Sequence, residues 1–171
     1  MKRITIIISV IVVAFAAVLV ACSKNNETST TLKIRLTDNP VNAEEVNVDI
    51  QQVRVNLQDD STGWVNLTTN AGIYNLLGLQ NGVDTLLASG LLPTNYVKEI
   101  RFVLGSANSI KVAGVAYPLT IPSGSESGLK IKVNKQLNTT LDSLLIDFDA
   151  ALSIHQVGTG IYHLKPVLKI K

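Results

Sequence analysis

Two aspartates, Asp147 and Asp149, are the residues whose type and spacing first suggest chemistry. They lie two positions apart in an alternating apolar segment, so both carboxylates would project from the same face of a strand. Two like charges about 6 to 7 Å apart need a cation or basic neighbours, and carboxylate oxygens suit Ca²⁺. Asp38 or Asp49 would complete such a site only if the fold brings them close. Asp38, Asp147 and Asp149 are therefore the acidic candidates for ligand binding.

Two lysines offer a competing explanation for the acidic pair. Lys130 and Lys132 are also two residues apart, on the preceding predicted strand, and opposite charges on neighbouring strands pair across the ladder. We favour this pairing over calcium because the chain has no EF-hand-like D-x-D-x-D-G loop. A glycosidase also uses two carboxylates, about 5 to 9.5 Å apart, but its pair flanks a substrate cleft, unlike two neighbours on one strand. The sequence therefore predicts no catalytic residue and no cofactor.

Aromatic residues are few, which limits carbohydrate binding. Trp64 is the lone tryptophan and follows a turn, so it is the candidate for an exposed flat ring; packing beneath a loop is the competing interpretation. His155 and His163 are the only histidines, and the Gly158–Gly160 segment between them predicts a hairpin that they straddle. Without a third ligand they are a weak metal site. The serine-rich segment 123–127 does not fit the G-x-S-x-G frame of a nucleophile elbow.

The first 22 residues contain a different kind of chemistry. Lys2 and Arg3 precede a mainly apolar run, residues 4–20, in which only Thr5 and Ser9 are polar, which is typical of a secretory signal. The sequence that ends at Cys22, Leu-Val-Ala-Cys, resembles a bacterial lipobox. This resemblance implies cleavage before Cys22 and a diacylglyceryl thioether on its sulfur, and two or more acyl chains anchor a protein stably. The alternative is an uncleaved transmembrane helix, for which 17 residues is the short end of about 17 to 25.

Composition agrees with an exported, anchored domain. Two of the 15 basic residues lie in the signal, so the remaining chain has 13 basic and 13 acidic side chains, and no basic excess indicates nucleic acid. A single cysteine excludes an intrachain disulfide. We therefore expect a lipoprotein signal peptide at 1–21, a lipidated flexible tether at 22–31 and one domain at 32–171. The expected location is the outer membrane of the cell envelope, on either its periplasmic or its surface face.

The positioning elements are strands, because the dominant period from Leu32 onward is two. Ile100, Phe102 and Leu104 share one parity and are expected to face the core. About nine or ten short strands and no convincing helix predict an all-β fold, an antiparallel β-sandwich. The sequence contains no repeat of fixed period, which argues against a propeller or a solenoid. The clearest alternating segments are 32–36, 46–57, 96–104, 129–133, 144–150 and 162–170.

Two irregularities carry structural predictions. The apolar positions of 46–50 and 53–57 are one residue out of step, and a one-residue slip would send the second set to solvent. We therefore place a β-bulge at Gln51–Gln52. Pro166 lies inside the alternating segment 162–170 and has no N–H to donate to a ladder, so this strand is an edge strand or is broken there.

Several short motifs between Asp38 and Pro166 are specific enough to indicate a family. The strongest are Asp38-Asn39-Pro40, Pro122-Ser123-Gly124 with Gly128-Leu129-Lys130, Asp147-Phe148-Asp149-Ala150 and Leu164-Lys165-Pro166. In this order they resemble the domain-of-unknown-function family 4382 of bacterial envelope lipoproteins, over roughly residues 32–170. The resemblance implies a sandwich of transthyretin or carbohydrate-binding-module type with Greek-key connections, and it implies no known activity.

These observations favour a lipid-anchored, non-enzymatic binding module with the membrane as one partner. The first hypothesis is glycan binding, which predicts an exposed Trp64 or tyrosine beside polar loop groups. The second is a structural or adhesive envelope subunit that binds another protein, which predicts an exposed apolar edge at the Pro166 strand. An enzyme is the third hypothesis and would need a histidine to meet Asp147 or Asp149 in a pocket.

Overall fold

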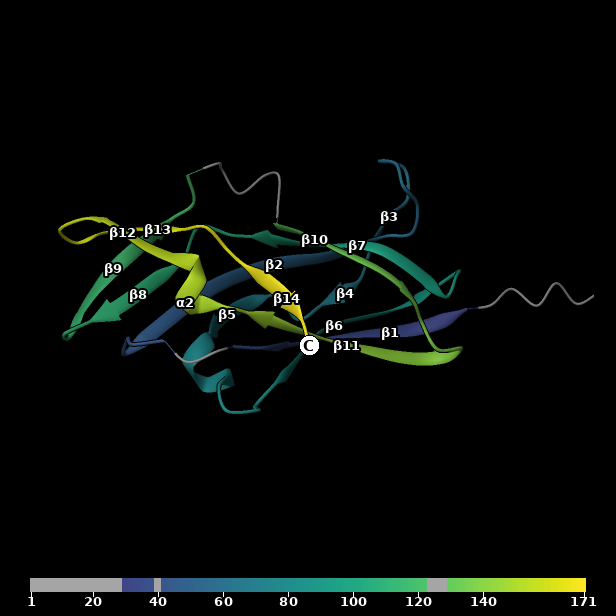
Figure 1. Cartoon of the computed structure of the whole chain (residues 1–171), viewed down its shortest axis with the longest axis horizontal. Coiled ribbons are helices and arrows are strands. Elements are labelled where there is room, and N and C mark those ends of the chain that lie inside the picture. Colours follow the sequence, from purple (N-terminus) through teal and green to yellow (C-terminus); the bar gives the residue numbers. More distant parts are fainter. Residues whose placement is uncertain (1–28, 39–40, 123–128) are drawn as a thin grey trace, which may run out of the picture.

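Two β-sheets packed face to face contain most of the regular structure (Figure 1). The computed structural model describes residues 29–38, 41–122 and 129–171. The smaller sheet has five strands, in the order β14 (Leu168–Ile170), β11 (Thr140–Phe148), β1 (Thr30–Thr37), β6 (Thr85–Leu92) and β4 (Thr68–Thr69).

The larger sheet is built around one long strand, β2 (Glu45–Asn56). Short strands pair with different parts of both of its edges, among them β3 (Trp64–Asn66) and β5 (Gly72–Asn75). The remaining order is β10 (Leu129–Gln136), β7 (Tyr96–Leu104), β2, β8 (Ser109–Val112), β9 (Val115–Thr120), β13 (Ile161–Leu164) and β12 (Ile154–Gly158).

Helical structure in the described residues consists of two single turns, the 3-10 turn η1 (Leu76–Leu79) and the α-helical turn α2 (Ala150–Ser153). Each turn is capped by the side chain of the preceding residue: Asn75 accepts the Leu77 N–H, and Asp149 accepts the Leu152 N–H. Within the same residues, no helix has the length and apolar character needed to cross a membrane.

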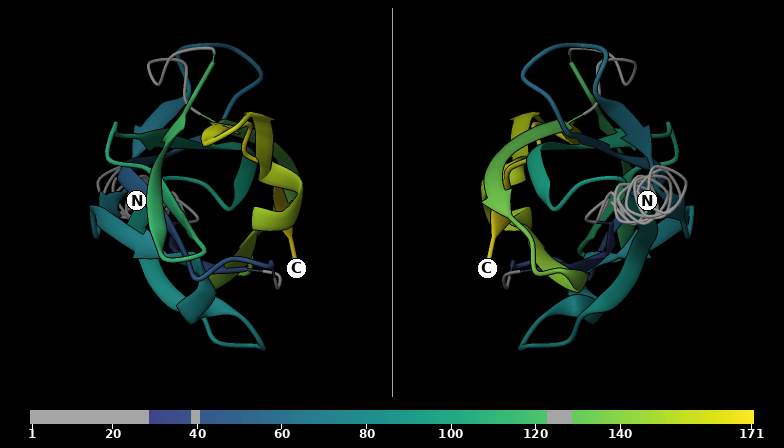
Figure 2. Two further views of the ribbon diagram at one scale, coloured as in Figure 1. Left: turned by 90° about the vertical axis from the view of Figure 1, so that its left-hand side faces the viewer. Right: turned by 90° about the vertical axis from the view of Figure 1, so that its right-hand side faces the viewer.

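One apolar core fills the space between the sheets, and the end-on views show the strands wrapped around it (Figure 2). On β7, Ile100 and Phe102 are fully buried and Leu104 is 4% exposed, as their shared parity predicts. On β1, Leu32 and Leu36 are fully buried as well. Burial of each side chain of this size contributes about 1.5–3 kcal/mol, so the period of two is the main determinant of the fold. The predicted all-β sandwich is confirmed.

The irregularity in β2 is the predicted bulge. The register between β2 and β7 shifts between Ile50 and Gln52. Beyond the shift, Val53 and Val55 are fully buried again. One extra residue restores the inward face, and β2 continues unbroken for 12 residues.

Strand direction differs from the wholly antiparallel expectation, because the sheets are mixed. β1 and β11 run parallel from the Thr30–Thr140 pair to the Thr37–Asp147 pair, and β9 and β13 are also parallel. Alternation fixes which face of a strand is buried but carries no information on its direction. β1 begins at Thr30, so Thr30 and Thr31, which were expected in the tether, belong to the sheet.

The chain changes sheets at Pro166. The predicted strand 162–170 is broken into β13 and β14, with residues 165–167 between them. The Lys165 N–H donates to the Ser153 carbonyl, and the Val167 N–H donates to the Ser153 hydroxyl, both at 2.8 Å. Pro166, which has no N–H, therefore lies where the chain needs no ladder bond, and β14 forms an edge of the smaller sheet.

Candidate functional site

A polar groove lies on the outer face of the larger sheet, where β10, β7, β2 and β3 are neighbours. Its volume is about 380 Å³, within the range of about 300–1,000 Å³ that is usual for small-ligand sites. We call it the outer-face groove. Its lining consists of Asn56, Gln58, Asp59, Asp60, Ser61, Trp64, Lys98, Glu99, Arg101, Lys130, Lys132 and Asn134.

One wall of the outer-face groove is the loop 57–63, which connects β2 to β3. Asn56 shapes this loop from a buried position, 4% exposed. Its side-chain N–H donates to the Asp60 carbonyl at 2.8 Å, and its side-chain oxygen accepts the Gln58 N–H at 3.1 Å. A Cβ at Gly63 would overlap that same oxygen, so the loop requires glycine there. The local sequence therefore holds the wall in one conformation.

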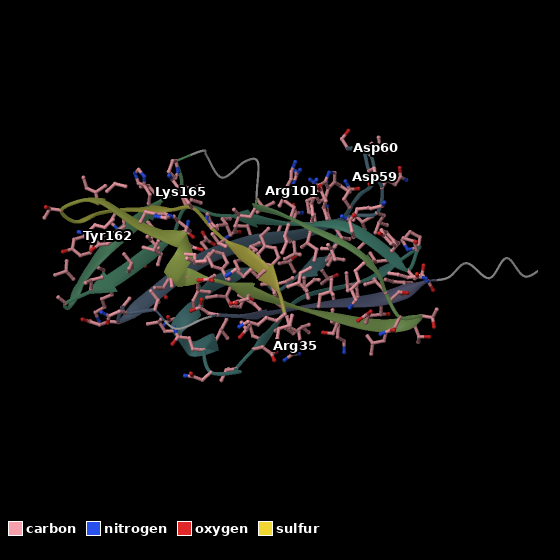
Figure 3. All side chains as sticks on the ribbon, in the orientation of Figure 1. Arg35, Asp59, Asp60, Arg101, Tyr162 and Lys165 are labelled. Carbon is pink, nitrogen blue, oxygen red and sulfur yellow. The ribbon has the colours of Figure 1, made fainter. Side chains whose placement is uncertain are left out.

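The lip of this wall is anionic. The carboxylate of Asp60 accepts bonds from the Thr62 hydroxyl and the Thr62 N–H, both at 2.7 Å. These bonds, the hydroxyl first, hold the pKa of Asp60 below its ordinary value. Asp59 is 84% exposed and forms an ion pair with Lys98 at 3.1 Å. Both side chains lie at the end of the loop beyond the sheet (Figure 3).

The floor of the groove contains two cations, Lys130 and Arg101, and the next strand continues them with Arg54, which lies outside the lining. We call these three residues on three adjacent strands the cationic row. Lys130 lies directly opposite Arg101 in the β10–β7 ladder, and Arg101 lies directly opposite Arg54 in the β7–β2 ladder. Residues directly opposite each other have Cβ atoms about 4.5–5.5 Å apart, and like charges in such positions repel. The row therefore concentrates positive charge on one part of the outer face.

Trp64 lies against this row. The guanidinium carbon of Arg101 is 4.2 Å from the centre of the Trp64 ring, and that of Arg54 is 5.7 Å from it. Guanidinium groups at these distances are attracted by the π-electrons of the ring. The Nε atoms of both arginines are buried, without a hydrogen-bond partner among the described residues. Trp64 is thus half-buried, fixed by cation–π contacts rather than covered by apolar packing.

The next row of the floor is neutral. Lys132 lies opposite Glu99 in the β10–β7 ladder, and Glu99 lies opposite Asn56 in the β7–β2 ladder. Opposite charges at neighbouring positions compensate each other. The groove therefore offers a cationic row, a neutral row, an aromatic ring and an anionic lip, an arrangement suited to binding a polar ligand with at least one negative group.

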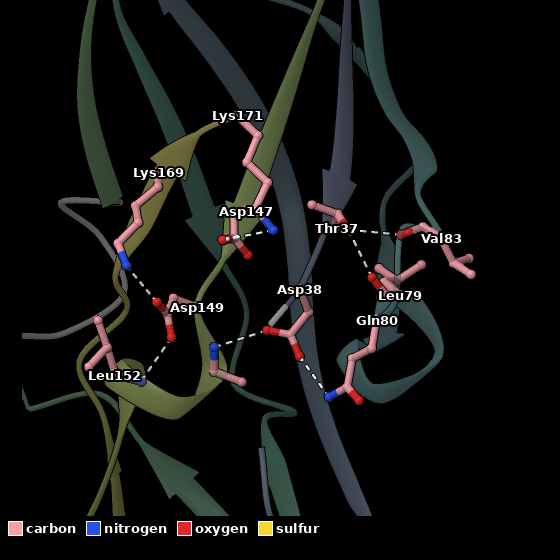
Figure 4. Close-up of polar contacts among 11 residues, drawn as sticks. Thr37, Asp38, Leu79, Gln80, Val83, Asp147, Asp149, Leu152, Lys169 and Lys171 are labelled. Carbon is pink, nitrogen blue, oxygen red and sulfur yellow. Dashed lines mark hydrogen bonds and ion pairs between the residues drawn. The ribbon is translucent and has the colours of Figure 1, made fainter. Parts of the chain in front are cut away.

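The predicted acidic pair lies elsewhere, at the junction of β11 and α2 (Figure 4). Asp147 and Asp149 are 1% and 4% exposed. Asp147 pairs with Lys171 at 3.2 Å, and Asp149 pairs with Lys169 at 2.6 Å. The prediction that Lys130 and Lys132 pair with these aspartates is wrong, because β10 pairs with β7 rather than with β11. The actual partners are also lysines two residues apart: Lys169 lies in β14, and Lys171 follows directly after it.

A site shared with the acidic pair required the fold to bring Asp38 or Asp49 close to it. Asp38 does lie close to the pair, but Asp49 does not. Asp38 accepts the Ala150 N–H at 3.0 Å and the Gln80 side-chain N–H at 3.2 Å. Asp49 lies instead on β2 of the larger sheet, where it accepts the Ala107 N–H at 3.2 Å. Across the part of the chain that the structure describes, no group of three or more His, Cys, Asp or Glu residues is arranged to hold a metal ion.

The remaining sequence candidates separate into two groups. His155 and His163 face each other across the β12–β13 hairpin, which confirms that they straddle a turn; His155 is exposed. Cys22 and the serine-rich segment 123–127 lie outside the described residues.

Sequence reasoning placed Trp64 in a candidate site but missed the arginines beneath it. The signal was present: Arg54, Arg101 and Lys130 each lie between two core-facing apolar residues of a strand, so all three had to share the outer face. What the pattern does not contain is the register, which aligns the three cations in one row.

The comparisons with known proteins identify the family of the chain. No curated protein and no solved structure matches this chain. The family model described as a domain of unknown function (DUF4382) matches residues 29–166, which include nearly all of the described structure. The chain therefore belongs to the DUF4382 family of domains of unknown function.

Proposed function

We propose that this domain is a non-enzymatic glycan-binding module, held at the cell envelope by a lipid anchor on Cys22, and that the outer-face groove is its binding site. The observation that carries the proposal is the position of Trp64 beside the polar lining of the groove. The fold class supports it, because a sandwich presents its loops and outer face on rigid strands.

The chemistry of the groove suits a sugar ring. A pyranose has an apolar C–H face and a rim of hydroxyl groups. Trp64 offers a flat aromatic surface, while Asn134 and Gln58 offer amides, which both donate and accept hydrogen bonds. A few fixed polar groups around an aromatic surface are the usual composition of a small-ligand site.

The chain has a built-in reporter for this proposal, because Trp64 is its only tryptophan. We expect that titrating a panel of oligosaccharides into the detergent-solubilised protein shifts the Trp64 emission. Isothermal titration calorimetry of Trp64→Ala then loses binding, while Tyr117→Ala, which removes an aromatic ring near β13 instead, retains it. A panel in which no glycan changes emission or heat would contradict the proposal.

The anchor has its own test. Radiolabelled palmitate should label the wild-type protein in cells, and Cys22→Ser should abolish the label and release the protein from the membrane fraction. Equal labelling of both proteins would contradict lipidation at Cys22.

A second candidate function is a structural or adhesive subunit that binds another protein. Exposed apolar side chains favour it: Val157 and Ile161 on the β12–β13 hairpin are 53% and 55% exposed, and Ile170 on the edge strand β14 is 37% exposed. Crosslinking in native envelopes distinguishes the two functions. An adhesive subunit would yield a protein partner that Val157→Lys with Ile161→Lys abolishes and that Trp64→Ala leaves intact.

A further inference from the structure

The charge of the outer-face groove narrows the class of glycan that it can bind. We infer that the ligand is an acidic glycan, one whose sugar units carry carboxylate or sulfate groups, rather than a neutral one. The inference rests on the proposed glycan-binding function and adds the chemical class of the ligand. The contact that would select it is between the two groove-lining members of the cationic row, Lys130 and Arg101, and the acidic group.

Charge is distributed unevenly across the groove. Each acidic residue of the lining lies next to a group other than the cationic row: Asp59 pairs with Lys98, Asp60 is bonded to Thr62, and Glu99 lies opposite Lys132. Among the described residues, the ion pairs present include none of the three cations of the row. A row of opposed like charges is unfavourable in the empty protein, and a bound anion would relieve it.

The geometry of the hydrogen-bond donors also suits an acidic group. Arg101 projects from the outer face of the larger sheet (Figure 3), and its guanidinium carbon lies over the Trp64 ring, 4.2 Å from the ring centre. Because its Nε is buried, the terminal N–H groups of Arg101 are the donors left for a ligand in the groove. A guanidinium that is already fixed loses little entropy on binding and matches the two oxygens of a carboxylate or sulfate.

The anionic lip of the groove disfavours ligands of dense negative charge, such as a lipid surface or a nucleic acid. The lip of the groove carries the carboxylates of Asp59, which is 84% exposed, and of Asp60, whose lowered pKa keeps it ionised. A lipid surface or a nucleic acid carries negative charge along its whole length. Its charges would be attracted by the cations but repelled by these carboxylates. A glycan with one acidic group per one or two rings avoids them, and its neutral ring lies against Trp64. The groove, at about 380 Å³, takes such a short segment rather than a flat surface.

The experiment compares matched acidic and neutral ligands on the full-length protein in detergent. The probes are an oligogalacturonate and its fully methyl-esterified form, and a κ-carrageenan oligosaccharide and its desulfated form. We expect at least one acidic member to shift Trp64 emission and to bind at least tenfold more tightly than its neutral counterpart. Its affinity should fall as NaCl rises, because salt screens exposed charges.

Variants connect the preference to the cationic row. Arg101→Gln and Lys130→Gln should each weaken the acidic ligand by about tenfold and leave the neutral ligand unchanged. The affinity of Arg101→Lys for the acidic ligand should lie between those of the wild type and Arg101→Gln, since lysine keeps the charge and loses the planar fork. Lys111→Gln is the matched control: Lys111 is paired with Glu44 and Glu45 on another part of the same sheet, and its loss should leave binding unchanged. Circular dichroism and thermal unfolding confirm that each variant is folded.

Each outcome is decisive. If neutral and acidic members bind equally, the acidic preference is wrong and glycan binding stands. If no glycan of either kind binds, the proposed function itself is wrong. If phosphatidylglycerol vesicles or a single-stranded oligonucleotide bind through Arg101 more tightly than every acidic glycan, the ligand class is wrong and an anionic surface or nucleic acid replaces it.

Discussion

Arg54 and Arg101 face each other across the β2–β7 ladder, and both guanidinium groups lie over the single tryptophan of the chain, Trp64. Two like charges at directly opposite positions reduce the stability of a sheet, and the aromatic ring offsets part of that repulsion. A protein under selection for stability alone would place a carboxylate or a neutral residue at one of the two positions. Under the proposed function, an anion bound beside this pair would relieve the remaining repulsion.

The repulsion within this pair should be measurable as a salt effect. In the wild type, raising NaCl from 20 to 500 mM should add about 0.5 kcal/mol to the free energy of unfolding through screening of the cationic row. Arg54→Gln should reduce that gain, and the difference should appear in urea denaturation followed by circular dichroism. Lys111→Gln, which removes attractive pairs instead, should not reduce it. An unchanged salt response in Arg54→Gln would mean that the opposed arginines do not repel.

A glycine in the loop after β7 should be indispensable. A Cβ at Gly105 would overlap the carboxylate of Asp49, and the Gly105 N–H donates to the Asp49 carbonyl at 2.8 Å. Because Asp49 is 7% exposed and bonded to the Ala107 N–H, it has little room to move. Gly105→Ala should lower the free energy of unfolding by about 1–3 kcal/mol, as overpacking does.

Gly72 supplies the matched control for that prediction. A Cβ there would meet no atom within 4 Å, and its backbone φ lies outside the left-handed region. Gly72→Ala should change the free energy of unfolding by less than about 0.5 kcal/mol in the same urea titration. Equal effects of the two substitutions would show that the contact with Asp49 is not what constrains Gly105.

The fold was largely predictable, because burial in a sheet follows a period of two. The clearest case is the bulge at Gln51–Gln52, where the slip in the apolar pattern could be resolved in only one way that kept Val53 and Val55 inside. The break at Pro166 followed from the missing N–H. Strand direction was not predictable: the parallel pairing of β1 with β11 joins segments about a hundred residues apart, and alternation does not record it.

The site was predictable only in part, because the alternation of residues along a strand does not record which strands are its neighbours. Trp64 could be named from its type and its turn. The aspartates at 147 and 149 could be matched to lysines two residues apart, but Lys169 and Lys171 satisfy that spacing as well as Lys130 and Lys132 do. Choosing between them requires the strand order, a property of the whole sheet. The cationic row has the same origin, since three separate outward positions become one surface only through register.

Asp149 should matter for stability through two contacts. One carboxylate oxygen accepts the Leu152 N–H at 3.1 Å and caps α2, and the other pairs with Lys169 at 2.6 Å. Asp149→Ala should lower the free energy of unfolding by about 1–2 kcal/mol. Asp149→Asn, which keeps a capping oxygen, should lose less. Asp59→Ala is the control, because Asp59 is 84% exposed and its ion pair contributes little. Comparable losses in Asp149→Ala and Asp59→Ala would refute the role of the cap.

Asp142 should make the domain sensitive to acid. Burial alone would raise the pKa of Asp142, but the N–H groups of Asn138 and Ser143, with help from Lys135, outweigh it and hold the pKa below its ordinary value. Asp142 is 7% exposed, and the two N–H groups lie 2.8 and 2.7 Å from its oxygens. The folded state therefore releases the proton more readily than the unfolded chain does.

The sign of the effect follows from this difference. Because the folded pKa is lowered, the carboxylate of Asp142 contributes its stabilisation fully above the unfolded pKa, and protonation removes it as pH falls through the folded value. Stability should therefore decline below about pH 4, the usual pKa of an aspartate. Urea midpoints measured from pH 7 to pH 2.5 should fall more steeply for the wild type than for Asp142→Asn, which has no proton to gain. The two curves should converge at the acid end, and parallel curves would assign the acid sensitivity to other carboxylates.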